Sequence, residues 1–245
     1  MTEVILLAAG VLAVAALYST VGHGGASGYL AVMALAGLAP ATMRPAALSL
    51  NLIVAGLAAW HFDRAGWFSG RLFWPFAAAS IPAAALGGAL ALPDPIYKRL
   101  VGVVLLYAAW HLFRTAGRAS EPGARPPAVP VALAVGAALG LLSGLTGVGG
   151  GIFLSPLLLA VGWAGAKETA AVSAVFILVN SAAGLGSFLA VGGSVPVELW
   201  PMVPAAAVGG AAGGALGARR LAGPTIRRVL AAVLVLAAIK FLLLI

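Results

Sequence analysis

The sequence contains no cysteine and only six acidic residues among its 245 positions. The absence of cysteine excludes disulfides, thiolate metal sites and a cysteine nucleophile, although it assigns no cellular compartment. Charged residues of both signs make up 8% of the chain, against about 25% in an average soluble domain. Hydrophobic residues make up 62%, which is more apolar surface than a soluble fold of this length can bury. The composition therefore indicates an all-α protein that crosses the membrane several times.

Long uncharged stretches separate the few charged residues, and the stretch from Val4 to Met43 contains no charged residue. A membrane-spanning helix needs about 20 apolar residues, and no stretch resembles a cleavable signal peptide. Glycine, proline and charge signals divide the apolar runs into helical segments. Two of these, 26–40 and 150–162, are short, so each either crosses obliquely or dips into the membrane and returns. The ten expected segments are 4–22, 26–40, 44–62, 70–92, 96–114, 130–147, 150–162, 166–190, 197–218 and 225–244.

Basic residues outnumber acidic residues by 14 to 6, which gives a net charge of +8. No basic face or aromatic platform accompanies this charge, so we expect no nucleic-acid partner. Basic residues in short loops instead mark the cytoplasmic side of a membrane protein and can contact lipid headgroups. If the linker 114–127 is cytoplasmic, ten basic residues lie inside and only Arg44, Lys98, Arg99 and Lys240 lie outside. We therefore expect an integral protein of the bacterial cytoplasmic (inner) membrane with both termini outside.

The two halves of the chain share an ordered set of residues, which predicts an internal duplication. A shift of 125 positions superposes Gly22, Gly24 and Gly25 on Gly147, Gly149 and Gly150, and a shift of 126 superposes Trp74-Pro75 on Trp200-Pro201. The expected organisation is a first transmembrane repeat over 1–114, a cytoplasmic linker over 115–129 and a second repeat over 130–245. Because the first repeat starts outside and the second inside, the repeats have inverted topology, as in many secondary transporters.

Glycine is concentrated in two strings at matching places, "VGHGGASGYL" at 21–30 and "TGVGGGIFL" at 146–154. A broken membrane helix leaves backbone groups without partners, so breaks persist only where protein, water or a ligand satisfies them. The helix that resumes after a break presents free N–H groups and its positive end, which favour an anion. Close helix packing is the alternative explanation, and we assign Gly87, Gly88, Gly209, Gly210, Gly213 and Gly214 to it. For the strings we favour a backbone anion site that includes Gly22, Gly24, Gly25, Gly147, Gly149, Gly150 and Gly151.

Polar side chains near the strings are further candidates for substrate binding. Thr20 and Thr146 either bond their own helices or turn toward a ligand, and Ser27 and Ser155 either cap the resuming helices or donate to an anion. Asn51 and Asn180 lie in apolar segments, where a buried amide needs partners. His23 is either a structural histidine or a group that attracts the anion or carries a coupling proton. Arg44, just before Pro45 at a helix start, is interpreted as an ordinary loop charge, with anion attraction at the outer mouth as the alternative.

The strings "GHGGASGYL" at 22–30 and "GVGGGIFLSPLLL" at 147–159, with the two-repeat layout, resemble the TauE/SafE family of membrane permeases, often described as sulfite exporters. The resemblance extends over essentially the whole chain. It implies transport of small sulfur-containing or organic anions such as sulfite, organosulfonates or sulfoacetate. In the first string His23 and Ala26 stand where the second has Val148 and Gly151, so the two halves need not contribute equally.

The leading hypothesis is a secondary transporter that moves a small anion by alternating access around a midplane site at the two strings. A passive anion channel with a glycine-rich re-entrant filter is the alternative, and carbonyls before each break offer a site for Na⁺. No P-loop is present, and the deep segments lack paired carboxylates or a nucleophile–base pair, so we expect neither an ATPase nor another enzyme. We expect no cofactor and no metal; the expected partners are the substrate, lipid, a coupling proton and a second copy in a homo-oligomer.

Overall fold

A computed structural model describes residues 2–115, 127–219 and 224–243. Within these ranges the chain forms ten α-helices and one short 3₁₀ helix, and the described residues include no strand. The helices are α1 (Thr2–Ser19), α2 (Ala26–Leu35), α3 (Pro40–Arg64), α4 (Gly70–Ala89), α5 (Asp94–Thr115), α6 (Val129–Thr146), α7 (Gly151–Ala160), α8 (Ala166–Ala190), η1 (Val197–Leu199), α9 (Met202–Arg219) and α10 (Pro224–Leu243). The prediction of an all-α fold with ten helical segments is confirmed.

The two largest differences from the predicted boundaries, five residues each, lie at the end of α2 and at the start of α9. The sequence predicted one helix from residue 197, whereas the structure has η1 over Val197–Leu199 and a separate helix from Met202. Pro201 precedes that helix, and Pro204 lies in its first turn. Proline is tolerated there because the first N–H groups of a helix have no intrahelical acceptor. The two prolines therefore favour a new helix start over continuation of the preceding turn.

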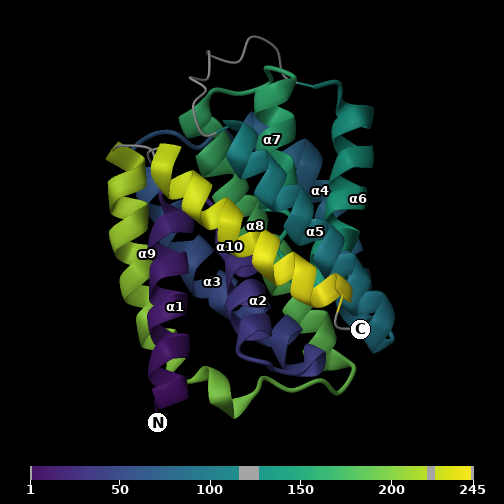
Figure 1. The fold of residues 1–245 in the computed structure, drawn as a ribbon. Helices are drawn as coiled ribbons and strands as arrows, with labels where there is room; N and C mark the ends of the chain where they lie inside the picture. Colours follow the sequence, from purple (N-terminus) through teal and green to yellow (C-terminus); the bar gives the residue numbers. More distant parts are fainter. Residues whose placement is uncertain (1, 116–126, 220–223, 244–245) are drawn as a thin grey trace.

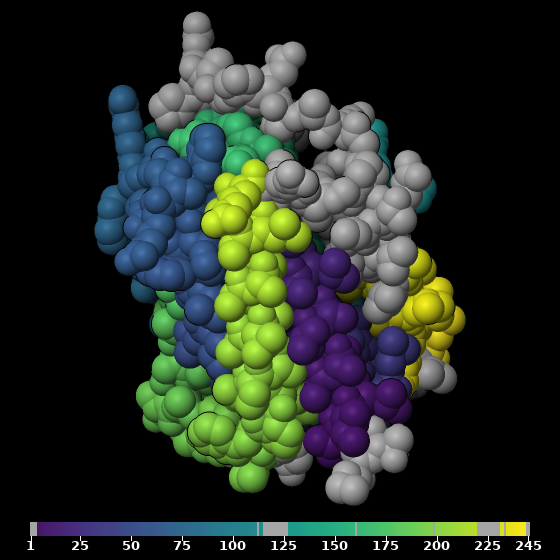
Figure 2. Space-filling model, turned by 90° about the vertical axis from the view of Figure 1, so that its left-hand side faces the viewer, coloured from purple at the N-terminus to yellow at the C-terminus, as the bar shows by residue number. Residues whose placement is uncertain are grey.

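Helices from the two halves of the chain are intermingled in the bundle (Figure 1). The long helices α3 and α8 contact each other. Helix α3 also packs on α9, which follows α8 in the chain, and α8 also packs on α4, which follows α3. Helix α1 packs on α9, α6 packs on α4, and α5 packs on α10. Figure 2 shows α1 and α9 side by side on one face of the molecule. The halves are thus interlocked and do not form two separate bundles.

Two short helices, α2 and α7, interrupt the pattern of long ones. Each has ten residues, which corresponds to about 15 Å of helix, half of the hydrocarbon thickness of about 30 Å. In Figure 1, α1 rises from the N-terminus at the lower edge and α2 runs back toward that edge, whereas α7 lies at the upper edge. Of the two sequence alternatives, a dip and return fits these lengths better than an oblique crossing.

Glycines away from the strings allow close contact between helices. A Cβ added at Gly87 would lie 2.5 Å from the carbonyl oxygen of Leu141 in α6, and one at Gly214 would lie 3.3 Å from the Cα of Ala58 in α3. Gly88 and Gly213 meet the backbones of α8 and α1 in the same way. The predicted packing role of these glycines is confirmed, because no larger residue fits between the backbones.

Apolar and aromatic side chains cover much of the outside of the bundle, as expected for a protein in lipid. Trp60, Trp67, Trp74, Trp110 and Trp200, all near helix ends, are exposed. Within the described residues, α3, α4, α6 and α8 are long and apolar enough to cross a membrane by length and composition. The protein is therefore an integral membrane protein with several spans.

Candidate functional site

Both glycine strings are breaks between helices. Helix α1 ends at Ser19 and α2 begins at Ala26, while α6 ends at Thr146 and α7 begins at Gly151. The residue before each short helix is a glycine with positive φ: 95° at Gly25 and 77° at Gly150. Residues with a side chain rarely adopt this conformation. Glycine is therefore required at these two positions for the chain to turn from one helix into the next.

The first turns of α2 and α7 have no side-chain caps. The residue before each helix is a glycine and makes no side-chain cap hydrogen bond. In α7 the N–H of Phe153 donates to the carbonyl of Gly150 at 3.1 Å, so only the earliest N–H groups of each helix lack an intrahelical acceptor. The described hydrogen bonds of Ser27 and Ser155 join other side chains, so the suggestion that these serines cap the helices is wrong. Uncapped N–H groups at the positive end of a helix dipole are suited to a negatively charged ligand.

Asn51 of α3 lies between the two breaks and is fully buried. A Cβ added at Gly24 would overlap its Oδ1, and a Cβ added at Gly149 would lie 2.7 Å from its Nδ2. The Nδ2 atom donates a hydrogen bond to Oγ of Ser181 in α8, at 3.2 Å. Among the described residues the Oδ1 atom has no hydrogen-bond partner. One amide side chain thus contacts both glycine strings.

Ile177 of α8 forms the apolar side of the same contact. Its Cγ2 would lie 3.0 Å from a Cβ at Gly24 and 2.7 Å from a Cβ at Gly149. Its Cδ1 would overlap a Cβ at Gly151, the first residue of α7. Both breaks therefore face the same side of α8, and glycine provides the space in which they approach one another.

His23 links the first break to helices from the second half of the chain. Its Nε2 lies 2.9 Å from Oγ of Ser155 in α7, and that oxygen lies 2.7 Å from Oγ of Ser173 in α8. All three side chains are buried. The sequence hypothesis of a structural histidine and that of a ligand-binding histidine are both compatible with this chain of polar groups.

The two threonines at the breaks bond mainly to their own helices. Thr20 Oγ1 donates to the carbonyl of Leu17 at 2.6 Å, and Thr146 Oγ1 donates to the carbonyl of Leu142 at 2.7 Å. The Thr146 oxygen also accepts from the N–H of Val148 at 3.3 Å. These hydroxyls therefore stabilise the ends of α1 and α6, the first of the two alternatives drawn from the sequence.

Asn180 and Ser27 also bond away from the contact between the breaks. Asn180 Nδ2 donates to the carbonyl of Phe176 in its own helix at 2.8 Å, and its Oδ1 has no hydrogen-bond partner in the described structure. Ser27 Oγ donates to the phenol oxygen of Tyr18 at 3.1 Å. The structure thus brings Gly24, Asn51, Gly149 and Gly151 together, and His23 to Ser155, but gives the other polar candidates local partners.

The remaining string glycines each meet a different neighbour. A Cβ at Gly22 would overlap the backbone of Ala170 in α8, and one at Gly147 would lie 3.0 Å from the carbonyl oxygen of Arg44. A Cβ at Gly25 would lie 2.7 Å from the Tyr29 ring, and one at Gly150 2.9 Å from the Phe176 ring. These four positions therefore leave little room for a side chain.

Arg44 is not the loop charge expected from the sequence. It lies inside α3, is buried, and directs its guanidinium to the end of α4. Nη1 donates to the carbonyl of Leu90 at 2.7 Å, and Nη2 donates to the carbonyls of Gly87, at 3.0 Å, and Gly88. The sequence prediction was wrong because Pro45, which suggested a helix start, lies in the second turn of a helix that begins at Pro40.

The sequence around the two breaks contains no acidic residue. The six acidic residues of the chain, Glu3, Asp63, Asp94, Glu121, Glu168 and Glu198, all lie outside residues 19–27 and 143–155. The described residues contain no group of three His, Cys, Asp or Glu side chains able to hold a metal ion. With helix N-termini and no adjacent carboxylate, the breaks favour an anion over a cation.

Sequence reasoning missed three residues of α8, namely Ser173, Ile177 and Ser181. They lie four positions apart, which places them on one face of a helix. All three are buried and contact residues of the breaks or Asn51. Two serines eight positions apart in an apolar helix were the available signal. Polar groups inside the membrane usually face the interior of the helix bundle, where they find hydrogen-bond partners.

Short helices that begin at breaks inside a bundle of apolar helices are typical of membrane transporters. The comparisons with known proteins agree. The family model described as "Sulfite exporter TauE/SafE" matches residues 6–241. A "probable membrane transporter protein y4hK" of Sinorhizobium fredii is 39% identical over 246 residues, which covers 98% of this chain and 99% of that protein. No solved structure matches the chain.

The chain therefore belongs to the TauE/SafE family of sulfite exporters. As a member of that family it is a membrane transporter and not an enzyme.

Proposed function

We propose that the protein is a secondary transporter that moves a small anion by alternating access between two inverted repeats. The anion binds near the middle of the membrane, where the N-terminal ends of α2 and α7 approach each other. The observation that carries this proposal is the position of Asn51, whose amide contacts Gly24 of the first break and Gly149 of the second. An anion held there interacts with both repeats at once, so their relative movement can change its access.

Corresponding helix contacts support the inverted repeat. In the proposed duplication each of the helices α1 to α5 corresponds to the helix five numbers later, α6 to α10. The contact α1–α9 then corresponds to α6–α4, α3–α9 to α8–α4, and α2–α10 to α7–α5, and all six pairs are in contact. The packing glycines follow the same exchange. Gly87 and Gly88 meet α6 and α8, whereas Gly213 and Gly214, 126 positions later, meet α1 and α3.

Two basic side chains make matching contacts in the two halves. Arg44, near the start of α3, donates to carbonyls at the end of α4. Lys167, at the start of α8, donates to the carbonyls of Ala218, at 2.9 Å, and Arg219, at 3.1 Å, at the end of α9. Each cation also lies over an aromatic ring, Arg44 over Phe188 at 5.4 Å and Lys167 over Trp67 at 5.0 Å. A duplicated arrangement accounts for both sets of contacts.

The substrate class follows from the family and from the chemistry of the breaks. The relevant anions are sulfite, organosulfonates and sulfoacetate, since each carries oxyanion groups that backbone N–H donors can bind. His23 and Ser155 add side-chain donors on one side, which distinguishes the site from a purely backbone cradle. A proton gradient or the substrate's own gradient drives the movement.

A panel of these anions tests the proposal in reconstituted liposomes and by thermal unfolding in detergent. We expect one class of anion to raise the unfolding temperature and to cross the membrane with saturable kinetics. Gly150→Leu should abolish both responses, because Gly150 has positive φ and lies against the Phe176 ring. Very fast flux without saturation would favour the passive channel, and no response to any anion would contradict transport of these ligands.

The orientation has a test of its own, because the chain has no cysteine. Ala36 and Val161, the residues that end α2 and α7, are both exposed and differ by 125 positions. We expect an impermeant maleimide to label Ala36→Cys only from outside the cell and Val161→Cys only from the cytoplasmic side. Labelling of both from one side would contradict the inverted repeat.

A further inference from the structure

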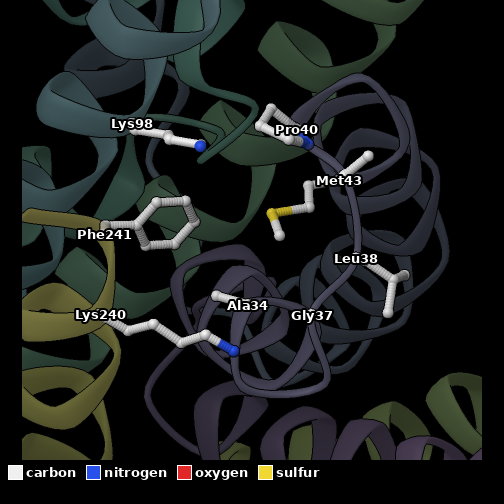
Figure 3. A pocket seen from close by; sticks show the side chains of 9 residues that line it. Ala34, Gly37, Leu38, Pro40, Met43, Lys98, Lys240 and Phe241 are labelled. Atoms are coloured by element: carbon white, nitrogen blue, oxygen red, sulfur yellow. The ribbon is translucent and has the colours of Figure 1, made fainter. Parts of the chain in front are cut away.

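A pocket of about 280 Å³ lies at the far end of α2 from its break. Its walls come from the end of α2, the turn over residues 36–39, the start of α3, and helices α5 and α10. Since α2 spans about 15 Å, the pocket is separate from the contact between the breaks. Figure 3 shows its lining, with the Met43 sulfur and the Phe241 ring between two lysine side chains.

Two cations share this pocket. Lys98 comes from α5 and Lys240 from α10, and both side chains line the pocket (Figure 3). Lys240 Nζ donates to the carbonyl of Leu35, at the C-terminal end of α2, at 3.1 Å. That bond uses one of its three N–H donors. Lys98 has no hydrogen bond or ion pair in the described part of the chain, so most of its donors are available.

The positive charge is not balanced within the lining. The described lining residues include no carboxylate, and Met43 and Phe241 are apolar and buried. The C-terminal dipole of α2 offsets part of the charge on Lys240. Asp94 lies one turn before Lys98 in α5, but the described structure has no ion pair between them, so the pocket is lined by two cations without a paired carboxylate. An anion bound between them would neutralise both cations.

We propose that Lys98 and Lys240 form a second binding site, for a compact oxyanion group such as a sulfate, sulfonate or phosphate. Pockets for drug-sized ligands measure about 300–1,000 Å³, so this one accepts a small anion or a single lipid headgroup. The two ammonium groups bind the oxygen atoms, and Met43 and Phe241 contact any short apolar substituent. In the proposed orientation the pocket opens to the outside. The site itself does not depend on the proposed transport function, because its evidence lies in the pocket alone.

The test measures binding of sulfate to purified protein in lipid-free detergent, and binding of phosphatidylglycerol by native mass spectrometry. The variants are Lys98→Gln, Lys240→Gln and the double variant. Arg99→Gln is the matched control, because it removes the same charge from the adjacent exposed residue outside the lining. Glutamine at position 240 keeps a donor for Leu35, and unfolding temperatures in anion-free buffer identify any variant that fails to fold.

We expect the double variant to weaken binding of the responding probe by about tenfold or more, equivalent to about 1.4 kcal/mol, while Arg99→Gln leaves it within about twofold. A sulfate response assigns the site to free anions, and a phosphatidylglycerol response that sulfate does not displace assigns it to lipid. Equal binding by wild type and double variant, equal losses in Arg99→Gln, or no binding of either probe would overturn the proposal. Gly24→Ala separates the two sites, since it should retain this binding even if transport is lost.

Discussion

His23 Nε2 and Ser155 Oγ lie 2.9 Å apart although 132 residues separate them in the chain. The first residue belongs to the break before α2, and the second lies in α7, which follows the other break. This contact and the position of Asn51 join the two glycine strings into one buried polar cluster. The proposed anion site depends on these contacts between the two strings.

Substituting alanine at Gly24 should disrupt the close approach of the two breaks around Asn51. The added Cβ would overlap Asn51 Oδ1, and overpacking of this kind costs about 1–3 kcal/mol. We expect anion flux to fall by at least about tenfold, as measured in liposomes. Gly186→Ala is the control, because a Cβ at Gly186 of α8 meets no atom within 4 Å. Equal flux in both variants would mean that the contact is not part of the transport path.

At Gly149 a substitution has two effects, strain in the backbone and crowding by the added side chain, and a second glycine allows them to be tested separately. Gly149 has φ of 80°, and its Cβ would meet Asn51 and Ile177. Gly162 has φ of 72° but open space around it, so alanine there imposes only the left-handed conformation, at about 1–2 kcal/mol. We expect Gly149→Ala to lose anion binding and Gly162→Ala to lower only the unfolding temperature. Loss of binding in both would assign the effect to backbone strain and not to crowding at the site.

The two asparagines should differ in their effect on transport. Asn51 contacts both breaks, whereas Asn180 donates to the carbonyl of Phe176 in its own helix. Asn51→Ala should raise the anion concentration needed for half-maximal flux by about tenfold. Asn180→Ala should chiefly lower stability, by about 1 kcal/mol for one hydrogen bond. Comparable kinetic effects from both substitutions would contradict the placement of the site beside Asn51.

The hydrogen bonds of Arg44 should stabilise the end of α4. A cation at a helix C-terminus contributes up to about 2 kcal/mol where it is partly buried, and Arg44 donates to three carbonyls there. We expect Arg44→Gln to lower the unfolding temperature more than Lys167→Gln, because the Lys167 Nζ contact with Arg219 is exposed to solvent. Equal effects would show that burial of the guanidinium adds nothing.

Much of the architecture was predictable from the sequence because apolar length and helix breakers act locally. Most helix boundaries, the two breaks at Gly25 and Gly150, and the packing role of Gly87 and Gly214 were predicted from residues within a short stretch, whereas the end of α2 and the starts of α3 and α9 were not. Glycine leaves a clear signal because few other residues tolerate positive φ or such close backbone contact.

The partners of individual polar groups were not predictable in the same way. Asn51 finds Ser181, 130 residues later, and Arg44 finds carbonyls 43 to 46 residues later. Such pairs depend on how the helices of the two halves pack against each other. A single sequence does not determine which residues of those helices meet. The local hydrogen bonds of Thr20 and Thr146, by contrast, were among the stated alternatives, because a hydroxyl in a membrane helix readily bonds the preceding turn.

The most direct test is to locate a bound anion by its own scattering. Selenite is a selenium analogue of sulfite, and its anomalous signal in crystals of the wild-type protein, under conditions in which flux assays detect its transport, marks its position without reference to any variant. The account predicts a peak beside Asn51, between Gly24 and the first turn of α7. A peak found only elsewhere, such as between Lys98 and Lys240, would contradict it.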